Sequence, residues 1–312
     1  MSKNFNGIKY LIVGAIFAVG FLSGPPTVQA ATTVYFDSEN SAVYAGDTFL
    51  VNIKISTPDT PINAVDGTIL YDNSVLEIKE ISTGNSLLTL WPKPPTFSNE
   101  SGSLSFVGGV SGGFQSDGGN ILRIVFIAKS EGEAKIDFLD GFSIFLNDGQ
   151  GTSINPWLRP LSLNISKRPA EIPAKDEWQD LIEKDKISPE FVEAIIGQDS
   201  FLFDNQYFVS FFAIDKESGI AYYEIKEGDR GFIRAESPYL LKDQSLKETV
   251  QIKAVDKAGN ESMAIPKLVP VPTTGVSYKT YLIWALVVLA ILAFVFWLWR
   301  IWAAKLRRNI QK

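Results

Sequence analysis

Apolar and polar residues alternate along most of the chain between residues 33 and 165. Residues 49–55 and 122–128 each place an apolar side chain at every second position. A period of two residues puts one set of side chains on each face of a β-sheet. We therefore expect strands in both segments. The same reasoning predicts strands at residues 33–36, 64–71, 76–81, 104–109, 134–138, 142–145 and 161–165.

Short turn sequences separate these segments. Gly, Asp and Asn cluster at residues 45–47, 72–74 and 147–149, among other places, and these residue types favour tight turns. About nine short strands with such spacing predict an all-β sandwich, most simply a jelly roll.

Three short motifs in this region carry a family resemblance. They are Ala45-Gly46-Asp47 before a strand, Tyr71-Asp72 followed by Leu76, and Ile124-x-Phe126-x-Ala128-Lys129 before Gly132. Over residues 31–166 the chain resembles the cohesin module, a nine-stranded jelly roll that shares its fold with some cellulose-binding modules. The resemblance implies a sheet face that receives a dockerin domain. It carries no dockerin-contacting residue onto this chain.

A second strand-rich region occupies residues 188–270. Strands are expected at 191–196, 207–214, 220–226, 231–235 and 249–256. The segments 215–220, 223–225 and 254–260 resemble bacterial Ig-like or fibronectin-III-like modules, which implies a spacer or an adhesive module. Residues 167–187 form the linker, in which 176–186 is either a short helix or a charged connection with one Trp.

The two ends of the chain have patterns typical of export and of membrane anchoring. Residues 1–30 have the pattern of a signal peptide, with an uncleaved anchor as the alternative. A Pro-rich stalk at 271–280 precedes an apolar segment at 281–302, which predicts one transmembrane helix with aromatic residues near both ends. The basic tail at 303–312 predicts a cytoplasmic C-terminus, so both modules are expected to be extracellular.

The charge of residues 31–279, the part expected outside the cell, disfavours one class of partner. Residues 31–279 hold 22 Lys and Arg against 35 Asp and Glu, a net charge of −13. Such a surface repels phosphate backbones, so nucleic acid is not expected as a partner. The absence of cysteine means that no disulfide stabilises either module, and their stability must come from apolar cores.

Catalysis is also disfavoured. The chain contains no His and no Cys, the commonest general base and thiol nucleophile. Residues 109–113 match the G-x-S-x-G nucleophile elbow, but no His can accept the serine proton. Carboxylate pairs such as Asp137 and Asp140 are expected by chance among so many acids. We predict that the chain is not an enzyme.

Four aromatic residues are candidates for ligand binding. Trp91 lies in a Pro-rich segment that is expected to form a rigid loop, and Phe97, Phe114 and Trp157 are expected in comparable loops. Aromatic rings stack on sugar faces and anchor protein interfaces. The alternative is that these rings close the ends of the sandwich core.

Calcium is the one cofactor for which the sequence offers ligands. Asp215, Glu217, Asp256 and Asn260 fall in loops that can neighbour one another in a sandwich, and hard cations prefer oxygen ligands. The alternative is turn chemistry, in which Asp and Asn accept hydrogen bonds from nearby backbone amides.

These features together predict a cell-membrane protein with a non-catalytic binding or adhesive role. The leading hypothesis is docking of a dockerin-like protein on the cohesin-like module. A carbohydrate-binding module linked to polysaccharide catabolism and a purely structural surface spacer remain alternatives.

Overall fold

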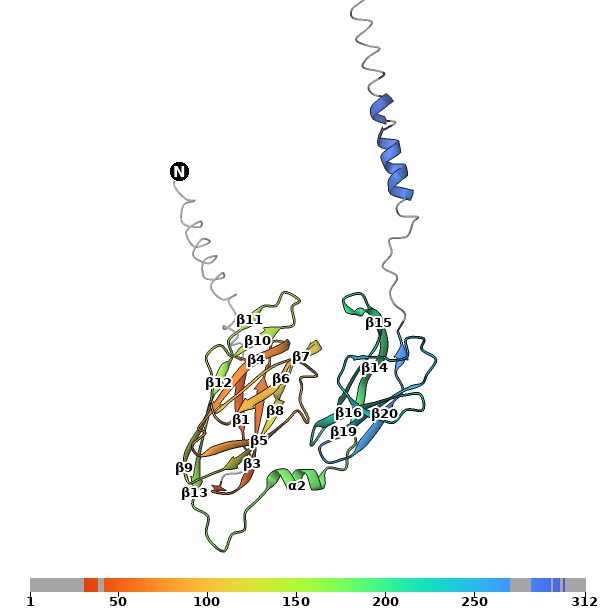
Figure 1. Cartoon of the computed structure of the whole chain (residues 1–312). Helices are drawn as coiled ribbons and strands as arrows, with labels where there is room; N and C mark the ends of the chain where they lie inside the picture. The colour runs from red at the N-terminus through yellow and green to blue at the C-terminus, as the bar shows by residue number, and fades with distance from the viewer. Residues whose placement is uncertain (1–30, 39–41, 270–281, 293, 298–299, 301–312) are drawn as a thin grey trace, which may run out of the picture.

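The computed structural model describes residues 31–38, 42–269, 282–292, 294–297 and 300. Two β-sandwiches lie side by side, and a short helix connects them (Figure 1). The expected signal peptide at 1–30, the stalk at 271–280 and the tail at 303–312 lie outside the described residues.

The first sandwich consists of thirteen strands in two sheets. Strands β12, β1, β3, β8 and β5 form the five-stranded sheet, in that order. The eight-stranded sheet has the order β11-β10-β4-β9-β13-β2, with β7 paired to β4 and β6 paired to β7. The strand bounds are β1 (Thr33–Asp37), β2 (Val43–Tyr44), β3 (Thr48–Ser56), β4 (Ile62–Tyr71), β5 (Leu76–Ser82), β6 (Leu90–Ser98), β7 (Ser103–Phe114), β8 (Asp117–Ala128), β9 (Gly132–Phe138), β10 (Ser143–Leu146), β11 (Ser153–Ile154), β12 (Trp157–Arg159) and β13 (Leu161–Ser166).

The alternation in the sequence corresponds to the inner faces of these sheets. Val51, Ile53 and Ile55 are fully buried, and so are Leu122 and Ile124 on the paired strand β8. Aromatic rings join the two sheets at one end of the core. The rings of Phe36 and Phe138 stack with centroids 4.4 Å apart, which adds a directional contact to the burial of apolar area.

Strand β6 is the longest of the strands that the sequence pattern did not predict. It carries Pro92, Pro94 and Pro95, which lack an N–H group, so we expected a rigid loop there. The structure tolerates the prolines because β6 pairs on one side only, with β7, and the register shifts twice along the pair. Residues 108–119, which are rich in glycine, are also mostly strand, because β7 continues to Phe114 and β8 begins at Asp117.

The second sandwich consists of two four-stranded sheets around a smaller core. The strand orders are β18-β15-β14-β21 and β17-β16-β19-β20. Val209 and Phe211 from one sheet pack with Ile225 and Ile252 from the other. The strand bounds are β14 (Glu190–Asp199), β15 (Leu202–Ile214), β16 (Ile220–Glu227), β17 (Ile233–Ala235), β18 (Tyr239–Leu240), β19 (Val250–Asp256), β20 (Glu261–Ala264) and β21 (Lys267–Leu268).

A short helix, α2 (Glu177–Lys184), occupies the expected linker. Asp176 caps its N-terminus, where Oδ1 accepts a hydrogen bond from the Gln179 amide at 3.0 Å. Trp178 is 2 % exposed, so its ring belongs to the packed interior of the junction and not to a solvated connection. The helical alternative for this segment is therefore the correct one.

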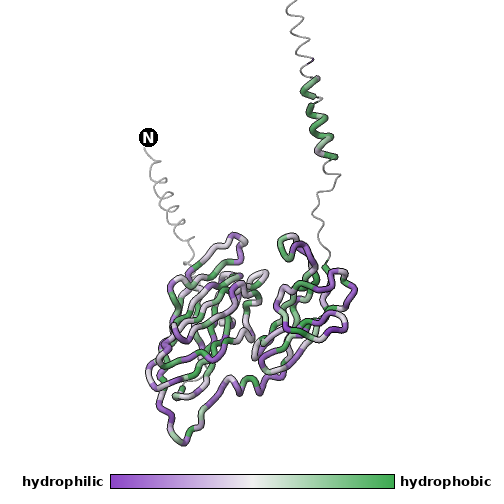
Figure 2. The backbone as a smooth tube through the Cα atoms, viewed as in Figure 1, coloured by the Kyte–Doolittle hydropathy of each residue, from purple (hydrophilic) through white to green (hydrophobic). Residues whose placement is uncertain are grey.

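The described C-terminal residues 282–292 and 294–297 are helical and apolar (Figure 2). Within the described part of the chain, no helix reaches both the length and the apolarity that membrane crossing requires. The expected span at 281–302 includes several residues outside that part, and it stays a prediction.

Candidate functional site

The two sheets of the first sandwich have very different outer surfaces. The outer surface of the five-stranded sheet carries α2. The backbone amide of Leu50 on β3 donates to Oε2 of Glu177 at 2.9 Å. The indole Nε1 of Trp178 donates to Oε2 of Glu80 on β5 at 3.1 Å. This sheet is therefore already engaged within the molecule.

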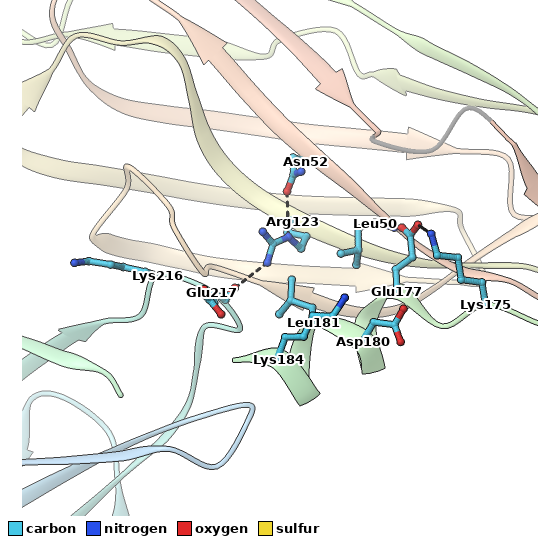
Figure 3. A pocket seen from close by; sticks show the side chains of 10 residues that line it. All are labelled: Leu50, Asn52, Arg123, Lys175, Glu177, Asp180, Leu181, Lys184, Lys216 and Glu217. Carbon is cyan, nitrogen blue, oxygen red and sulfur yellow. Dashed lines mark hydrogen bonds and ion pairs between the residues drawn. The ribbon is translucent and has the colours of Figure 1, made fainter. Parts of the chain in front are cut away.

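A cavity of about 440 Å³ lies where this sheet, α2 and the second sandwich meet (Figure 3). Arg123 is one of the residues that line the cavity. Its Nε donates to Oδ1 of Asn52 at 3.1 Å, and its Nη1 donates to the backbone oxygen of Glu217 at 2.8 Å. The guanidinium thus joins the two sandwiches, so the cavity is part of their junction. Its lining residues are Leu50, Asn52, Arg123, Lys175, Glu177, Asp180, Leu181, Lys184, Lys216 and Glu217.

A second set of hydrogen bonds connects the linker to the first sandwich. Asp47 is 6 % exposed and accepts hydrogen bonds from Nη2 of Arg168 at 2.7 Å and from the Lys175 amide at 2.8 Å. Burial alone would raise the pKa of Asp47, but these bonds and the Tyr44 amide outweigh it and lower the pKa below its usual value. The carboxylate is therefore held in its charged form.

The outer surface of strands β6, β7, β4 and β9, which we call the free face, is different. Its centre is a row across three strands, in which Lys93 pairs with Val107 and Val107 pairs with Asp66. Asp66 and Lys93 are exposed and Val107 is half-buried. The next row contains the short polar side chains of Thr96, Ser105 and Thr68, and Oγ1 of Thr96 lies 3.5 Å from Oγ of Ser105.

Exposed apolar residues frame this polar centre. They are Leu70, Leu90 and Leu139, with exposed fractions of 37 %, 52 % and 44 %. Scattered apolar side chains are ordinary on a protein surface and do not mark an interface by themselves. What distinguishes this face is that its central Asp66 and Lys93 are exposed, whereas the five-stranded sheet carries α2. The free face is therefore the best candidate binding surface of the first sandwich.

The four aromatic candidates lie on strands and not in the loops that we expected. Trp91 and Phe97 are on β6, Phe114 ends β7, and Trp157 is on β12 of the other sheet. The Trp91 ring packs edge-on against Phe106 with centroids 6.2 Å apart. Phe114 also packs against the core. Phe97 and Trp157 are exposed, but they lie on different sheets, so the four residues do not form one rim.

The candidate calcium ligands are divided in a similar way. Asp215 and Asp256 lie together in the second sandwich, and Asp185 from the end of α2 joins them. Nδ2 of Asn260 donates to Oδ2 of Asp256 at 2.9 Å, so Asn260 lies beside this cluster. Glu217 lines the cavity of Figure 3 instead.

The sequence pattern did not identify two groups of residues as site candidates. Asp185 was overlooked because it belongs to the linker, 30 residues before Asp215, and only the fold brings them together. The central row of the free face, Lys93, Val107 and Asp66, was overlooked because β6 was expected to be a loop. Strand alternation on β4 and β7 was the available signal for its other two members.

Comparison with solved structures gives several similar proteins of low identity. A non-cellulosomal cohesin from the hyperthermophilic archaeon Archaeoglobus fulgidus is 19 % identical, with 44 % of this chain and 93 % of that chain covered and a TM-score of 0.37. The seventh ScaB type I cohesin from Pseudobacteroides cellulosolvens is 22 % identical, with 46 % and 97 % covered and a TM-score of 0.38. A type I cohesin–dockerin complex from Clostridium thermocellum is 18 % identical, with 44 % and 99 % covered and a TM-score of 0.36.

Among curated proteins, none is significantly similar to this chain. A protein-family model does match, and its bounds fall within the first sandwich. Residues 34–154 match the model described as the cohesin domain, which confirms the cohesin resemblance for this region of the chain.

Proposed function

We propose that the chain is a non-catalytic docking protein, in which the free face of the first sandwich receives a dockerin-like protein. The match of residues 34–154 to the cohesin domain carries this proposal, because cohesins receive dockerins on a sheet face. The structure leaves one such face uncovered by α2 and the second sandwich. Its central row of Lys93, Val107 and Asp66 supplies both charge signs around an apolar position.

The test is direct binding of the purified full-length chain to a panel of dockerin modules. Isothermal titration calorimetry is expected to give saturable 1:1 binding to at least one module. Val107→Arg places a long charged side chain at the centre of the free face, and we expect it to weaken binding by at least about 100-fold, since interface energy concentrates at such centres. Unchanged affinity in this variant would exclude the free face as the site.

A carbohydrate ligand is the second candidate, and Trp157 favours it. Its indole is 71 % exposed on β12, and on the same strand the Arg159 guanidinium lies 5.8 Å from the ring centroid of Tyr35 on β1. An exposed indole on a strand provides a flat surface on which a sugar ring stacks. This hypothesis predicts that the wild-type chain is retained on an insoluble glycan and that Trp157→Ala is not.

We further propose that the second sandwich is an Ig-like spacer and that the chain is anchored in a cell membrane. The proposal rests on the apolar segment at 281–302, the basic residues after it and the signal pattern at 1–30. Protease treatment of intact cells tests it. The acidic sandwiches are expected to be digested while the basic C-terminus is protected, and the opposite pattern would show an inverted orientation.

A further inference from the structure

Three buried carboxylates meet at the junction of the two sandwiches. Asp185 caps the C-terminus of α2, Asp215 follows β15 and Asp256 ends β19. One carboxylate oxygen of each lies within 4.8 Å of the other two. The three residues are 0 %, 5 % and 2 % exposed, so water does not screen their mutual repulsion.

Backbone amides orient the carboxylates toward one another. Oδ2 of Asp215 accepts from the amides of Glu217 at 3.0 Å and Gly219 at 2.7 Å. Oδ2 of Asp185 accepts from the Ser218 amide at 3.1 Å. The 215–219 loop therefore wraps around the cluster with its N–H groups pointing inward, which leaves the geometry of the carboxylates well defined.

The loop between β19 and β20 holds the Asp256 carboxylate. Its Oδ1 accepts from the Asn260 amide at 2.8 Å, and the Asn260 side chain also donates to the backbone oxygen of Asp185 at 3.3 Å. Asn260 thus connects the end of β19 to the end of α2. The cluster consists of contributions from the linker and from two separate loops of the second sandwich.

Two buried oxygens at this place have no hydrogen-bond partner in the described part of the chain. They are Oδ1 of Asp215 and the hydroxyl Oγ of Ser218, and Ser218 is fully buried. A buried polar atom without a partner is costly, and it marks a position where an ion or water belongs. Both atoms belong to the loop that wraps the cluster.

The charge of the cluster is not balanced by an ion pair within the described part of the chain. Among the described residues, no Lys or Arg forms an ion pair with Asp185, Asp215 or Asp256. Lys257, next in sequence to Asp256, is bound instead to Glu80 and to the backbone oxygen of Ile81. Burial, and then the nearby carboxylates of Asp185 and Asp256, raise the pKa of Asp215.

We propose that Asp185, Asp215 and Asp256 bind a divalent cation, for which Ca²⁺ is the best match. Three carboxylates offer hard oxygen ligands, and the unpartnered Oδ1 of Asp215 provides a free donor atom. Ca²⁺ accepts oxygen ligands in irregular arrangements at about 2.3–2.6 Å, whereas Mg²⁺ demands a regular octahedron. An asymmetric cluster from three separate segments suits the larger ion.

A cation bound at this cluster would affect the contact between the two sandwiches. The backbone oxygen of Asp215 accepts from the Asn85 amide at 2.9 Å, and that of Ser218 accepts from Oγ of Ser82 at 2.6 Å. The loop that would hold the cation is thus the loop that contacts the first sandwich. Cation binding therefore stabilises the relative orientation of the two sandwiches.

The experiment uses the full-length chain after treatment with a chelator. Calorimetric titration with CaCl2 is expected to show one site, and the melting temperature is expected to rise by about 5–10 °C when Ca²⁺ reaches 100 times its Kd. Equivalent MgCl2 should give a clearly smaller rise, and NaCl of equal ionic strength none. Binding of Ca²⁺ should also slow cleavage by trypsin after the exposed Lys186, next to Asp185.

Variants separate a cation site from a purely structural cluster. Asp215→Asn and Asp256→Asn should each lose the Ca²⁺-dependent rise in melting temperature, while the exposed Asp140→Asn control keeps it. Without Ca²⁺, Asp215→Asn should be no less stable than the wild type, because it removes repulsion. The proposal is overturned if CaCl2 leaves the wild-type melting temperature and trypsin cleavage unchanged, or if both variants respond to Ca²⁺ as the wild type does.

Discussion

The two outer surfaces of the first sandwich come from the same alternating strand pattern, but the molecule uses them differently. On the five-stranded sheet, Trp178 and Glu177 of α2 bind the strands, and Arg123 contacts the second sandwich. On the free face, the row of Lys93, Val107 and Asp66 contacts no other module through the described hydrogen bonds and ion pairs. The first surface positions the modules, and the second is the one that we propose for a partner.

Outward polar residues have different roles on the two sheets. Asn52 and Arg123 on the covered sheet are committed to hydrogen bonds within the chain. Thr68 on the free face lies on an open surface of short side chains. Outward polar residues that make internal bonds stabilise the fold, whereas those that do not are available for recognition.

Trp178→Ala should have the largest effect on the covered surface. It removes a ring that is 2 % exposed and its hydrogen bond to Glu80, so we expect a loss of about 3–5 kcal/mol in unfolding free energy. Chemical denaturation measures the loss. Trp157→Ala, at an indole that is 71 % exposed on the same sheet, is the matched control and should change stability by less than about 0.5 kcal/mol. Equal effects would show that α2 is not packed on the sheet.

Asp47→Asn should cost about 2–4 kcal/mol at pH 7, because it leaves Arg168 without its buried charge partner. The pH dependence has a defined sign. The pKa of Asp47 is lowered in the folded state, so its stabilisation is present above the unfolded pKa of about 3.9 and disappears as pH falls through the folded pKa. The stability difference between wild type and variant should therefore shrink below pH 4. A constant difference across pH 3–7 would contradict this account.

Gly84→Ala tests the contact between the modules. A Cβ atom at Gly84 would overlap the backbone oxygen of Glu217, so one module must move, at a cost of about 1–3 kcal/mol. Small-angle X-ray scattering should show a larger radius of gyration for this variant. Gly231→Ala is the control, since a Cβ atom there meets no atom within 4 Å. An unchanged scattering curve for Gly84→Ala would show that the junction is not packed as described.

Val107→Arg should have the smallest effect on stability. Val107 is half-buried on the outer side of β7, and an Arg side chain can extend along the free face into solvent. We expect a change of less than about 1 kcal/mol by chemical denaturation. A much larger loss would mean that Val107 contributes to the core and does not belong to an open surface.

The sequence predicted most of the framework because burial follows strand alternation. Ile53 and Leu122 were assigned to an inner face, and both are fully buried. Strand β6 was missed because local rules treat three prolines as a loop, whereas pairing along a single edge tolerates them. Without β6, the expected architecture lacked one strand of the candidate binding surface.

The acidic cluster shows a different limit of prediction from sequence. Asp215 and Asp256 were candidates because they lie in loops of one module, where turn chemistry and cation binding look alike. Asp185 could not be added, since its position depends on how the linker helix packs between two modules. Only the three-dimensional structure shows that Oδ1 of Asp215 lacks a partner among the described residues, and the proposed cation site rests on that observation.

The most direct test of the central claim compares dockerin affinities of three full-length proteins in the presence of Ca²⁺. These are the wild type, Val107→Arg on the free face and Trp157→Ala on the opposite sheet. We predict that the wild type and Trp157→Ala bind the same dockerin module with Kd values within about threefold, and that Val107→Arg loses at least about 100-fold. Failure of the wild type to bind any module, or equal affinity of Val107→Arg, would contradict the account.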